Sequence, residues 1–126
     1  MTCTANVRQS GDVAIVDLSG RFTLGDAAGV IRTSVKSLVD RGHCNILLNL
    51  ADVTHMDSAA GLGELIGSYQ LVTKMGGDLK LLNAQKSVAD VLRITRLDTV
   101  FKLYSDEAEA IGSFNQSAKG LPAETR

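Results

Sequence analysis

The stretch VTHMDSAAGLGEL, residues 53–65, is where the sequence gathers groups that could do chemistry. It places the carboxyl group of Asp57 beside the hydroxyl group of Ser58. Small residues follow the hydroxyl: Ala59, Ala60, Gly61 and Gly63. Because such residues leave the hydroxyl accessible and let the backbone of a partner approach closely, the stretch predicts a site of modification or docking.

The residues after Ser58 have the spacing of a helix. Its apolar stripe consists of Leu62, Leu65, Ile66, Tyr69 and Val72. The pair Gly76-Gly77 ends the helix, because glycine adopts the left-handed conformation of a helix end at little cost. Either Asp57 or Ser58 can cap its start, since each side-chain oxygen can accept a hydrogen bond from a free backbone amide.

A phosphate on Ser58 would lie in a favourable place, because the unpaired amides and the dipole of a helix N-terminus stabilise an anion. Phosphorylation adds about -1.5 to -2 of charge at neutral pH. The alternative is purely structural. In that interpretation the serine or its neighbour caps the helix, and the small residues permit tight packing of the helix on a strand.

Apolar periodicity along the chain predicts five strands and four helices. The expected strands cover residues 3–8, 13–18, 45–50, 78–83 and 99–104. The expected helices carry their apolar residues over 27–39, 62–72, 88–92 and 108–114, the first of them capped by Asp26. The first two strands form a hairpin, and the later ones need helical crossovers. The fold class is therefore α/β, with a mixed, largely parallel sheet of four to five strands and helices packed on it in the order β-β-α-β-α-β-α-β-α.

The length of 126 residues predicts one domain. We expect it to cover residues 1–114. Residues 115–126 contain the only proline and almost no apolar side chains, so a polar, disordered tail is expected there.

Charge and composition exclude several classes of partner. The formal net charge is -1 and no basic block occurs, which disfavours nucleic acid and anionic membranes. The start of the chain lacks the pattern of a secretory signal, and no apolar run approaches membrane-spanning length. We therefore expect a cytoplasmic protein in which Cys3 and Cys44 are reduced.

Residues 49–83, NLADVTHMDSAAGLGELIGSYQLVTKMGGDLKLLN, resemble the heart of STAS domains, the family of bacterial anti-sigma factor antagonists. Those domains show an apolar strand, a D-S-[ST]-G-[LI]-G signature, a helix, a GG break and a strand. The resemblance extends through VDLSGRFTLGD before this stretch and VLRITRLDTVFKLYSDEAEAI after it, and covers roughly residues 5–114. It implies a STAS-like fold, in agreement with the element order inferred from periodicity.

The resemblance implies a function as well. Members of the family bind an anti-sigma factor, a histidine-kinase-like ATPase that is also a serine kinase. Phosphorylation of the antagonist breaks the complex, and a phosphatase restores it. On this basis Ser58 is the candidate phosphoacceptor. Its surroundings form the predicted docking surface, which comprises Thr23, Leu24, Gly25, Asp26, Met56, Asp57, Ala59, Ala60, Gly61 and Gly63.

Two features depart from the family pattern. The signature usually has two hydroxyl residues before its glycine, the second often being the acceptor, whereas Ala59 and one extra residue stand here between Ser58 and Gly61. Many members also carry an aspartate where this chain has Thr23, with Asp26 three residues later. A non-phosphorylated STAS scaffold that only binds a partner is the alternative.

An enzyme that uses Ser58 as nucleophile is the rival from another class. It would need a base within hydrogen-bond reach, and the glycine positions of a G-x-S-x-G elbow are held by Met56 and Ala60. Ten residues separate Leu50 from the first of the glycines at 61, 63 and 67, too far for a dinucleotide loop. His43, Cys44 and His55 are too few for a metal site. We therefore expect no catalysis, no cofactor and no metal.

Overall fold

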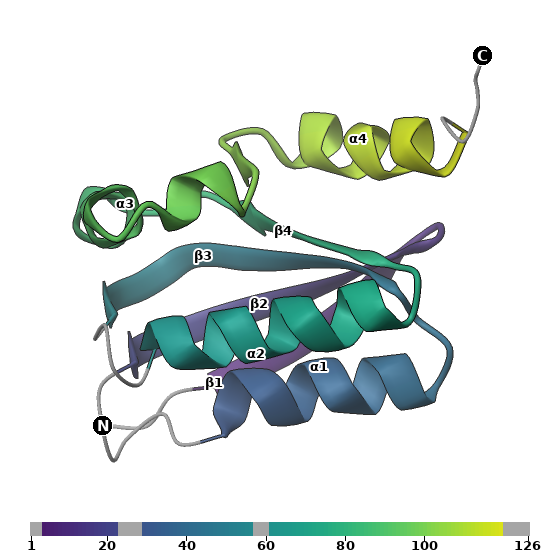
Figure 1. Cartoon of the computed structure of the whole chain (residues 1–126), viewed down its shortest axis with the longest axis horizontal. Helices are drawn as coiled ribbons and strands as arrows, with labels where there is room; N and C mark the ends of the chain where they lie inside the picture. Colours follow the sequence, from purple (N-terminus) through teal and green to yellow (C-terminus); the bar gives the residue numbers. More distant parts are fainter. Residues whose placement is uncertain (1–3, 23–28, 57–60, 120–126) are drawn as a thin grey trace.

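The computed structural model describes residues 4–22, 29–56 and 61–119, and in it the strands form one five-stranded sheet in the order β1-β2-β3-β4-β5 (Figure 1). The strands are β1 Thr4–Ser10, β2 Val13–Phe22, β3 Asn45–Met56, β4 Asp78–Leu82 and β5 Leu103–Tyr104. β1 and β2 pair antiparallel, and all later neighbours pair parallel. The predicted mixed, largely parallel α/β sheet is confirmed.

The four predicted helices are present. They are α1 Val30–Asp40, α2 Gly61–Lys74, α3 Lys86–Ile94 and α4 Glu107–Lys119, and a short 3-10 turn spans Leu97–Thr99. α1 and α2 lie side by side on one face of the sheet, and α4 lies on the other (Figure 1). No helix within the described ranges is both long and apolar enough to cross a bilayer.

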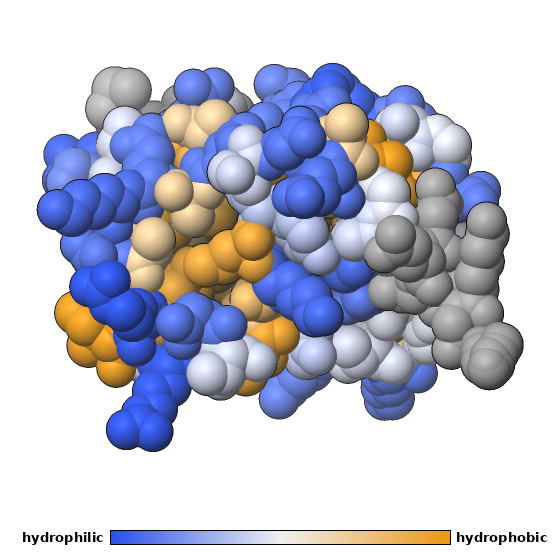
Figure 2. Space-filling view, turned by 90° about the horizontal axis from the view of Figure 1, so that it is seen from above, coloured by the Kyte–Doolittle hydropathy of each residue, from blue (hydrophilic) through white to orange (hydrophobic). Residues whose placement is uncertain are grey.

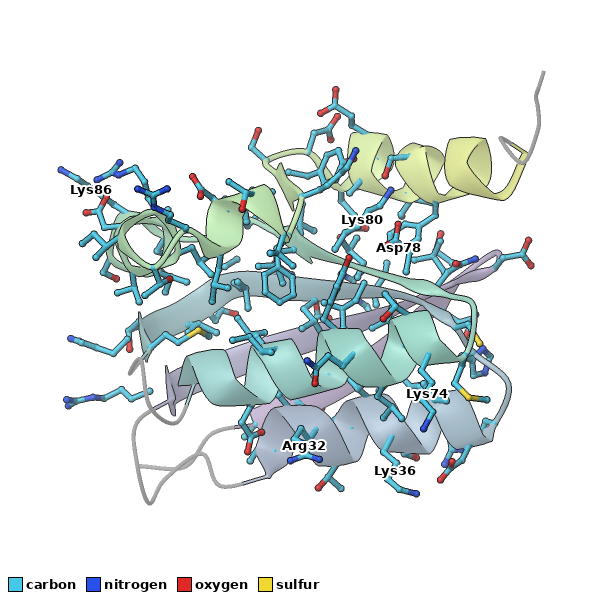
Figure 3. The ribbon with its side chains drawn as sticks, viewed as in Figure 1. Arg32, Lys36, Lys74, Asp78, Lys80 and Lys86 are labelled. Carbon is cyan, nitrogen blue, oxygen red and sulfur yellow. The ribbon has the colours of Figure 1, made fainter. Side chains whose placement is uncertain are left out.

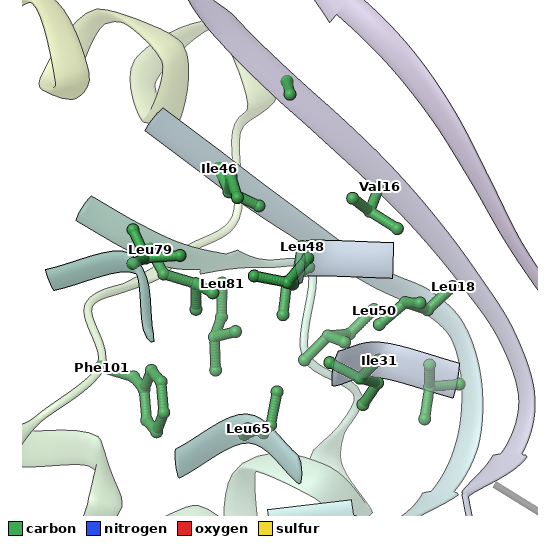
Figure 4. Close-up of a cluster of buried hydrophobic side chains, with 14 of the residues drawn as sticks. Val16, Leu18, Ile31, Ile46, Leu48, Leu50, Leu65, Leu79, Leu81 and Phe101 are labelled. Atoms are coloured by element: carbon green, nitrogen blue, oxygen red, sulfur yellow. The ribbon is translucent and has the colours of Figure 1, made fainter. Parts of the chain in front are cut away.

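The larger hydrophobic core lies between the sheet and the helices α1, α2 and α3. The central strand β3 contributes Ile46, Leu48 and Leu50, all without solvent exposure (Figure 4). Fully burying one such side chain stabilises the fold by about 1.5–3 kcal/mol. Leu47, which lies between Ile46 and Leu48 in β3, points to the opposite face of the sheet and joins a smaller core under α4. The apolar run at 45–50 is therefore covered on both faces, as predicted.

Glycine ends α2 as expected. Gly76 has φ +84, and the amide of Gly77 donates to the carbonyl of Val72 at 3.0 Å. Gly77 also passes so close to β3 that a Cβ there would overlap the carbonyl oxygen of Cys44. This contact fixes the turn between α2 and β4.

Several predicted boundaries were wrong. β2 and β3 run on to Phe22 and Met56, well past the expected ends at 18 and 50. Of the expected strand 99–104, only Leu103–Tyr104 is strand; the 3-10 turn ends at Thr99 and a loop follows it. Phe101 in this loop is buried by packing in the larger core and not by strand pairing.

The last helix continues through Lys119, so residues 115–119 of the expected disordered tail are helical. Residues 120–126 lie outside the described part of the chain, and the division of the chain at residue 114 stays a prediction.

The face of the molecule that carries α3 and α4 has hydrophobic residues gathered near its centre among hydrophilic ones (Figure 2). The exposed large hydrophobic side chains between the end of α3 and β5 are Ile94, Val100 and Leu103.

Candidate functional site

The two stretches predicted to form the docking surface leave the sheet from adjacent positions. β2 and β3 run parallel, and their last pairs are Arg21 with His55 and Phe22 with Met56. Residues 23–28 follow the first of these strands and residues 57–60 follow the second. Both stretches therefore start at the carboxyl edge of the sheet, where open α/β sheets usually present their sites.

Most of the predicted site residues lie outside the described residues. These are Thr23, Leu24, Gly25 and Asp26 in the first stretch and Asp57, Ser58, Ala59 and Ala60 in the second. The structure describes Met56, Gly61 and Gly63, and it describes the four chain positions at which the two stretches begin and end.

Met56 supports the site from within the core. Its side chain is only 6% exposed and belongs to the larger hydrophobic cluster. Burying it contributes about 1.5–3 kcal/mol and holds the end of β3 against the helices. Met56 thus anchors the stretch that carries Ser58, and its side chain is not part of an exposed surface.

α2 begins at Gly61, directly after the second stretch. Among its described side chains, the exposed ones are Gly63, Ile66, Gln70, Thr73 and Lys74. A Cβ at Gly63 would meet nothing within 4 Å, and Ile66 is 38% exposed. These exposed positions are uncharged before Lys74 in the last turn, and Gly63 adds no bulk near the start of the helix, which suits close approach by another protein there.

The start of α1 is held by a carboxylate from α2. The side chain of Glu64 accepts hydrogen bonds from the amides of Gly29 at 2.5 Å, Ile31 at 3.1 Å and Arg32 at 3.2 Å. α1 itself has no side-chain cap at Gly29 and no acidic residue in its first turn. Glu64 therefore satisfies amides that the helix cannot pair internally.

This arrangement corrects one sequence prediction. The first helix begins at Val30, with Gly29 at φ +79 in the capping position, so Asp26 is not its cap. The cap comes from Glu64, 35 residues away from Gly29. Short-range capping patterns cannot reveal such a residue, because its partner is fixed only by the packing of α1 on α2.

A groove of about 530 Å³ runs along the seam between α1 and α2. It is lined by Gly29, Arg32, Thr33, Lys36, Glu64 and Leu71. Arg32, Lys36 and Lys74 lie on the side of these helices that faces away from the sheet (Figure 3). A Cβ at Gly67 would lie 3.3 Å from Cδ of Arg32, so the arginine passes directly over the glycine.

The opposite face of the sheet carries a polar network. The guanidinium of Arg8 binds both carboxylate oxygens of Asp17, at 2.6 and 3.0 Å, and also Glu107 at 2.9 Å. Asn49 donates to Asp17 at 2.8 Å. The hydrogen bond from Arg8 lowers the pKa of Asp17. This network ties α4 to the hairpin, and local sequence patterns do not reveal it because Glu107 lies 99 residues from Arg8 in the chain.

The described residues also bear on two alternatives, a metal site and an enzyme that uses Ser58 as nucleophile. No group of three or more His, Cys, Asp or Glu side chains among them could hold a metal ion. Nδ1 of His55 lies 3.5 Å from Oγ1 of Thr54 at the exposed end of β3. Ser58 lies outside the described residues, so whether a base is within its reach is not tested.

Comparison with known proteins agrees with this arrangement. The STAS domain profile matches residues 4–110. The anti-sigma-B factor antagonist of Bacillus subtilis is 30% identical over 103 residues, which cover 82% of this chain and 92% of that protein.

Solved structures share the fold. An anti-sigma factor antagonist from Mycobacterium paratuberculosis superposes with a TM-score of 0.79 at 21% identity, covering 90% of this chain and 95% of that one. The Bacillus cell fate determinant SpoIIAA in its phosphorylated form gives a TM-score of 0.67 at 21% identity, covering 87% and 98%. The family profile and the identity to the Bacillus subtilis protein show that this chain belongs to the STAS domain family.

Proposed function

We propose that this protein is an anti-sigma factor antagonist that acts by binding and not by catalysis. Its partner is an anti-sigma factor of the histidine-kinase-like ATPase type, which also phosphorylates Ser58. Phosphorylation breaks the complex, and a phosphatase restores the binding form. The switch operates in the cytoplasm and controls sigma-factor-dependent transcription.

One observation carries the proposal. The ends of β2 and β3 are paired neighbours, and the starts of α1 and α2 are joined through Glu64. Both stretches with predicted site residues are therefore anchored together at each end. Two stretches held in this way suit a single continuous surface that a partner can recognise.

The relatives support the same function. The Bacillus subtilis relative is named an anti-sigma-B factor antagonist. The structural relative SpoIIAA exists in a phosphorylated form. Ser58 is the residue of this chain that matches the first hydroxyl of the family signature, and serine is a residue type that protein kinases modify.

The physical basis of the switch is the cost of burying charge. A phosphate on Ser58 is well solvated in the free protein, whereas a partner that closes over it would remove that water. Unless the partner provides matching cations, the complex loses affinity. A single added negative charge can thus decide whether the docking surface is occupied.

A charge-matched pair of variants tests this proposal. Ser58→Asp adds a negative charge and Ser58→Asn adds almost the same volume without it. Calorimetric titration with the purified kinase-type anti-sigma factors of the same genome should show at least about tenfold weaker binding for Ser58→Asp, equal to about 1.4 kcal/mol, and a much smaller loss for Ser58→Asn. Equal affinities of the two variants would contradict the switch.

A second function within the family is favoured by the sequence around Ser58. Ala59 and the extra residue before Gly61 depart from the two-hydroxyl signature, and a constitutive scaffold needs no acceptor. Such a scaffold would bind its partner equally well in both variants. The same titration therefore separates the two functions.

A further inference from the structure

We infer that Glu64 is a positioning residue of the docking surface, whose carboxylate locks the first turn of α1 to the first turn of α2. The inference rests on the proposed function, because the docking surface is defined by that function. It deepens the function by naming a contact between the two helices that follow the stretches of the docking surface. Neither the family signature nor the capping pattern of the sequence assigns a role to this residue.

The geometry of Glu64 is that of a carboxylate bound in a nest of amides. One oxygen accepts from Gly29, and the other accepts from both Ile31 and Arg32, at distances between 2.5 and 3.2 Å. Hydrogen bonds to an ionised group are about twice as strong as neutral ones. The negative charge also lies against the positive end of the α1 dipole.

Nothing else in the described part of the chain performs this task for α1. Gly29 provides no side chain, and the first turn of the helix contains no acidic residue. Among the described residues, Glu64 is the side chain that the amides of Gly29, Ile31 and Arg32 bind. Substituting glutamine would keep one oxygen but would turn an NH2 group toward amides that are themselves donors.

The position of this contact makes it a tie between the two stretches of the docking surface. Residues 23–28 end at Gly29, which Glu64 binds, and residues 57–60 end at Gly61, one turn before Glu64 on the same helix. Their other ends are fixed independently by the pairing of Phe22 with Met56. Loss of Glu64 would leave the sheet pairing in place and release the tie at the helix end.

A second contact runs along the same seam but does not replace the first. The side chain of Arg32 crosses over Gly67. It contacts α2 further along the helix, away from Gly61. Glu64 is therefore the polar contact that lies nearer to the starts of both helices, where Ile31 and Leu65 are also buried in the larger core.

The test uses three variants of the full chain. Glu64→Gln removes the charge at constant size, and Glu64→Asp keeps the charge on a shorter side chain. Glu109→Gln makes the same chemical change in the first turn of α4, where the side chain is exposed. Two quantities are measured at a temperature where each variant is folded: hydrogen exchange of backbone amides, and the association and dissociation rates with the purified kinase-type anti-sigma factors of the same genome.

A positioning role predicts a specific kinetic pattern. When only a fraction of molecules holds the binding-competent arrangement, apparent affinity falls by that fraction, so the loss appears in the association rate. Glu64→Gln should associate at least about fivefold more slowly with an unchanged dissociation rate. The amides of Gly29, Ile31 and Arg32 should exchange at least about tenfold faster, while those of α3 and α4 keep their rates.

The other variants complete the pattern. Glu64→Asp should lie between the native protein and Glu64→Gln in both measurements, and it carries the test if the glutamine variant does not fold. Glu109→Gln should match the native protein. An unchanged association rate in both Glu64 variants would overturn the inference, and so would a faster dissociation rate alone, which would make Glu64 a direct contact residue.

Failure of the inference differs from failure of the proposed function. If the native protein binds its partner and the Glu64 variants bind equally fast, only the positioning role is wrong. If the native protein binds none of the kinase-type anti-sigma factors, the proposed function fails and the inference falls with it.

Discussion

A methyl group at Gly63 should separate the stability of this protein from its ability to bind. Gly63 lies in the first turn of α2, within the predicted docking surface, and the residue is exposed to solvent. A Cβ at this position would meet nothing within 4 Å. The substitution Gly63→Ala therefore introduces no clash in the free protein.

The expected magnitudes have opposite signs for folding and for binding. Alanine in a helix is more stable than glycine by about 0.5–1 kcal/mol, chiefly because glycine loses more backbone entropy on folding. A partner that packs its backbone against the glycine would instead meet an extra methyl group. Inserting a methyl group into a well-packed contact costs about 1–3 kcal/mol, which corresponds to a loss of affinity of about tenfold or more.

Urea unfolding and calorimetric titration measure the two effects. Gly112→Ala is the matched control, because Gly112 lies in α4 away from the docking surface and a Cβ there also meets nothing within 4 Å. Both variants should be more stable than the native protein, and only Gly63→Ala should bind the kinase-type partner more weakly. Undiminished binding by Gly63→Ala would refute the reasoning that the glycine serves close approach.

Substitutions at three further positions test the account of the fold. Gly77→Ala should destabilise the protein by about 3 kcal/mol or more in urea unfolding, because the new Cβ would overlap the carbonyl of Cys44; a loss below about 1 kcal/mol would contradict the observed approach. Asp17→Asn should reduce the free energy of unfolding more at pH 7 than at pH 3: Arg8 lowers the pKa of Asp17 in the folded state, so its stabilisation is fully present above the unfolded pKa of about 3.9 and is lost progressively as pH falls below that value and through the folded pKa. An equal loss at both pH values would show that the ion pair is not responsible. Lys80 is 2% exposed, with its amine 4.6 Å from the ring centre of Phe114 between β4 and α4 (Figure 3) and donating to Ser113 at 2.8 Å; Lys80→Ala should cost about 2–5 kcal/mol by leaving a cavity, whereas Lys80→Met, which keeps the volume and loses the hydrogen bond, should cost less, about 1–2 kcal/mol. Equal thermal destabilisation by both would contradict this account.

The sequence predicted the order and type of the elements because their apolar periodicities are strong. It did not predict the length of β3. Val53 and Met56 are buried beyond the expected end of this strand at residue 50. They are three residues apart, which breaks the two-residue period of a strand. The pairing with β2 shifts register between Gly20 and Arg21, which explains the break. A bulge of this kind leaves no clear local signal.

The strand expected at 99–104 is shorter than predicted, since only Leu103–Tyr104 is β5, and for a different reason. Its β-branched and aromatic residues indicated burial correctly at Phe101, which is 1% exposed. Burial there comes from packing against Tyr69 of α2, with the ring centres 5.3 Å apart. Hydrophobicity predicts that a side chain is buried, but not which backbone conformation buries it.

The candidate site was predictable only in part. The signature around Ser58 could be recognised from local residues, since the residue types and their spacing are contiguous in the chain. The contribution of Glu64 could not, because it depends on a contact with Gly29 across the packed pair α1 and α2. Capping patterns describe neighbours along the chain, and this cap is supplied by tertiary structure.

Mapping of phosphate on the protein is the most direct test of the central claim. The native chain and a Ser58→Ala variant are incubated with ATP and each purified kinase-type anti-sigma factor of the same genome, and peptides are then examined by mass spectrometry. We predict one phosphate on Ser58 in the native chain, none in the variant, and dissociation of the complex as the phosphate accumulates. Unmodified Ser58 in a complex with an active kinase, or phosphate on another residue, would contradict the claim.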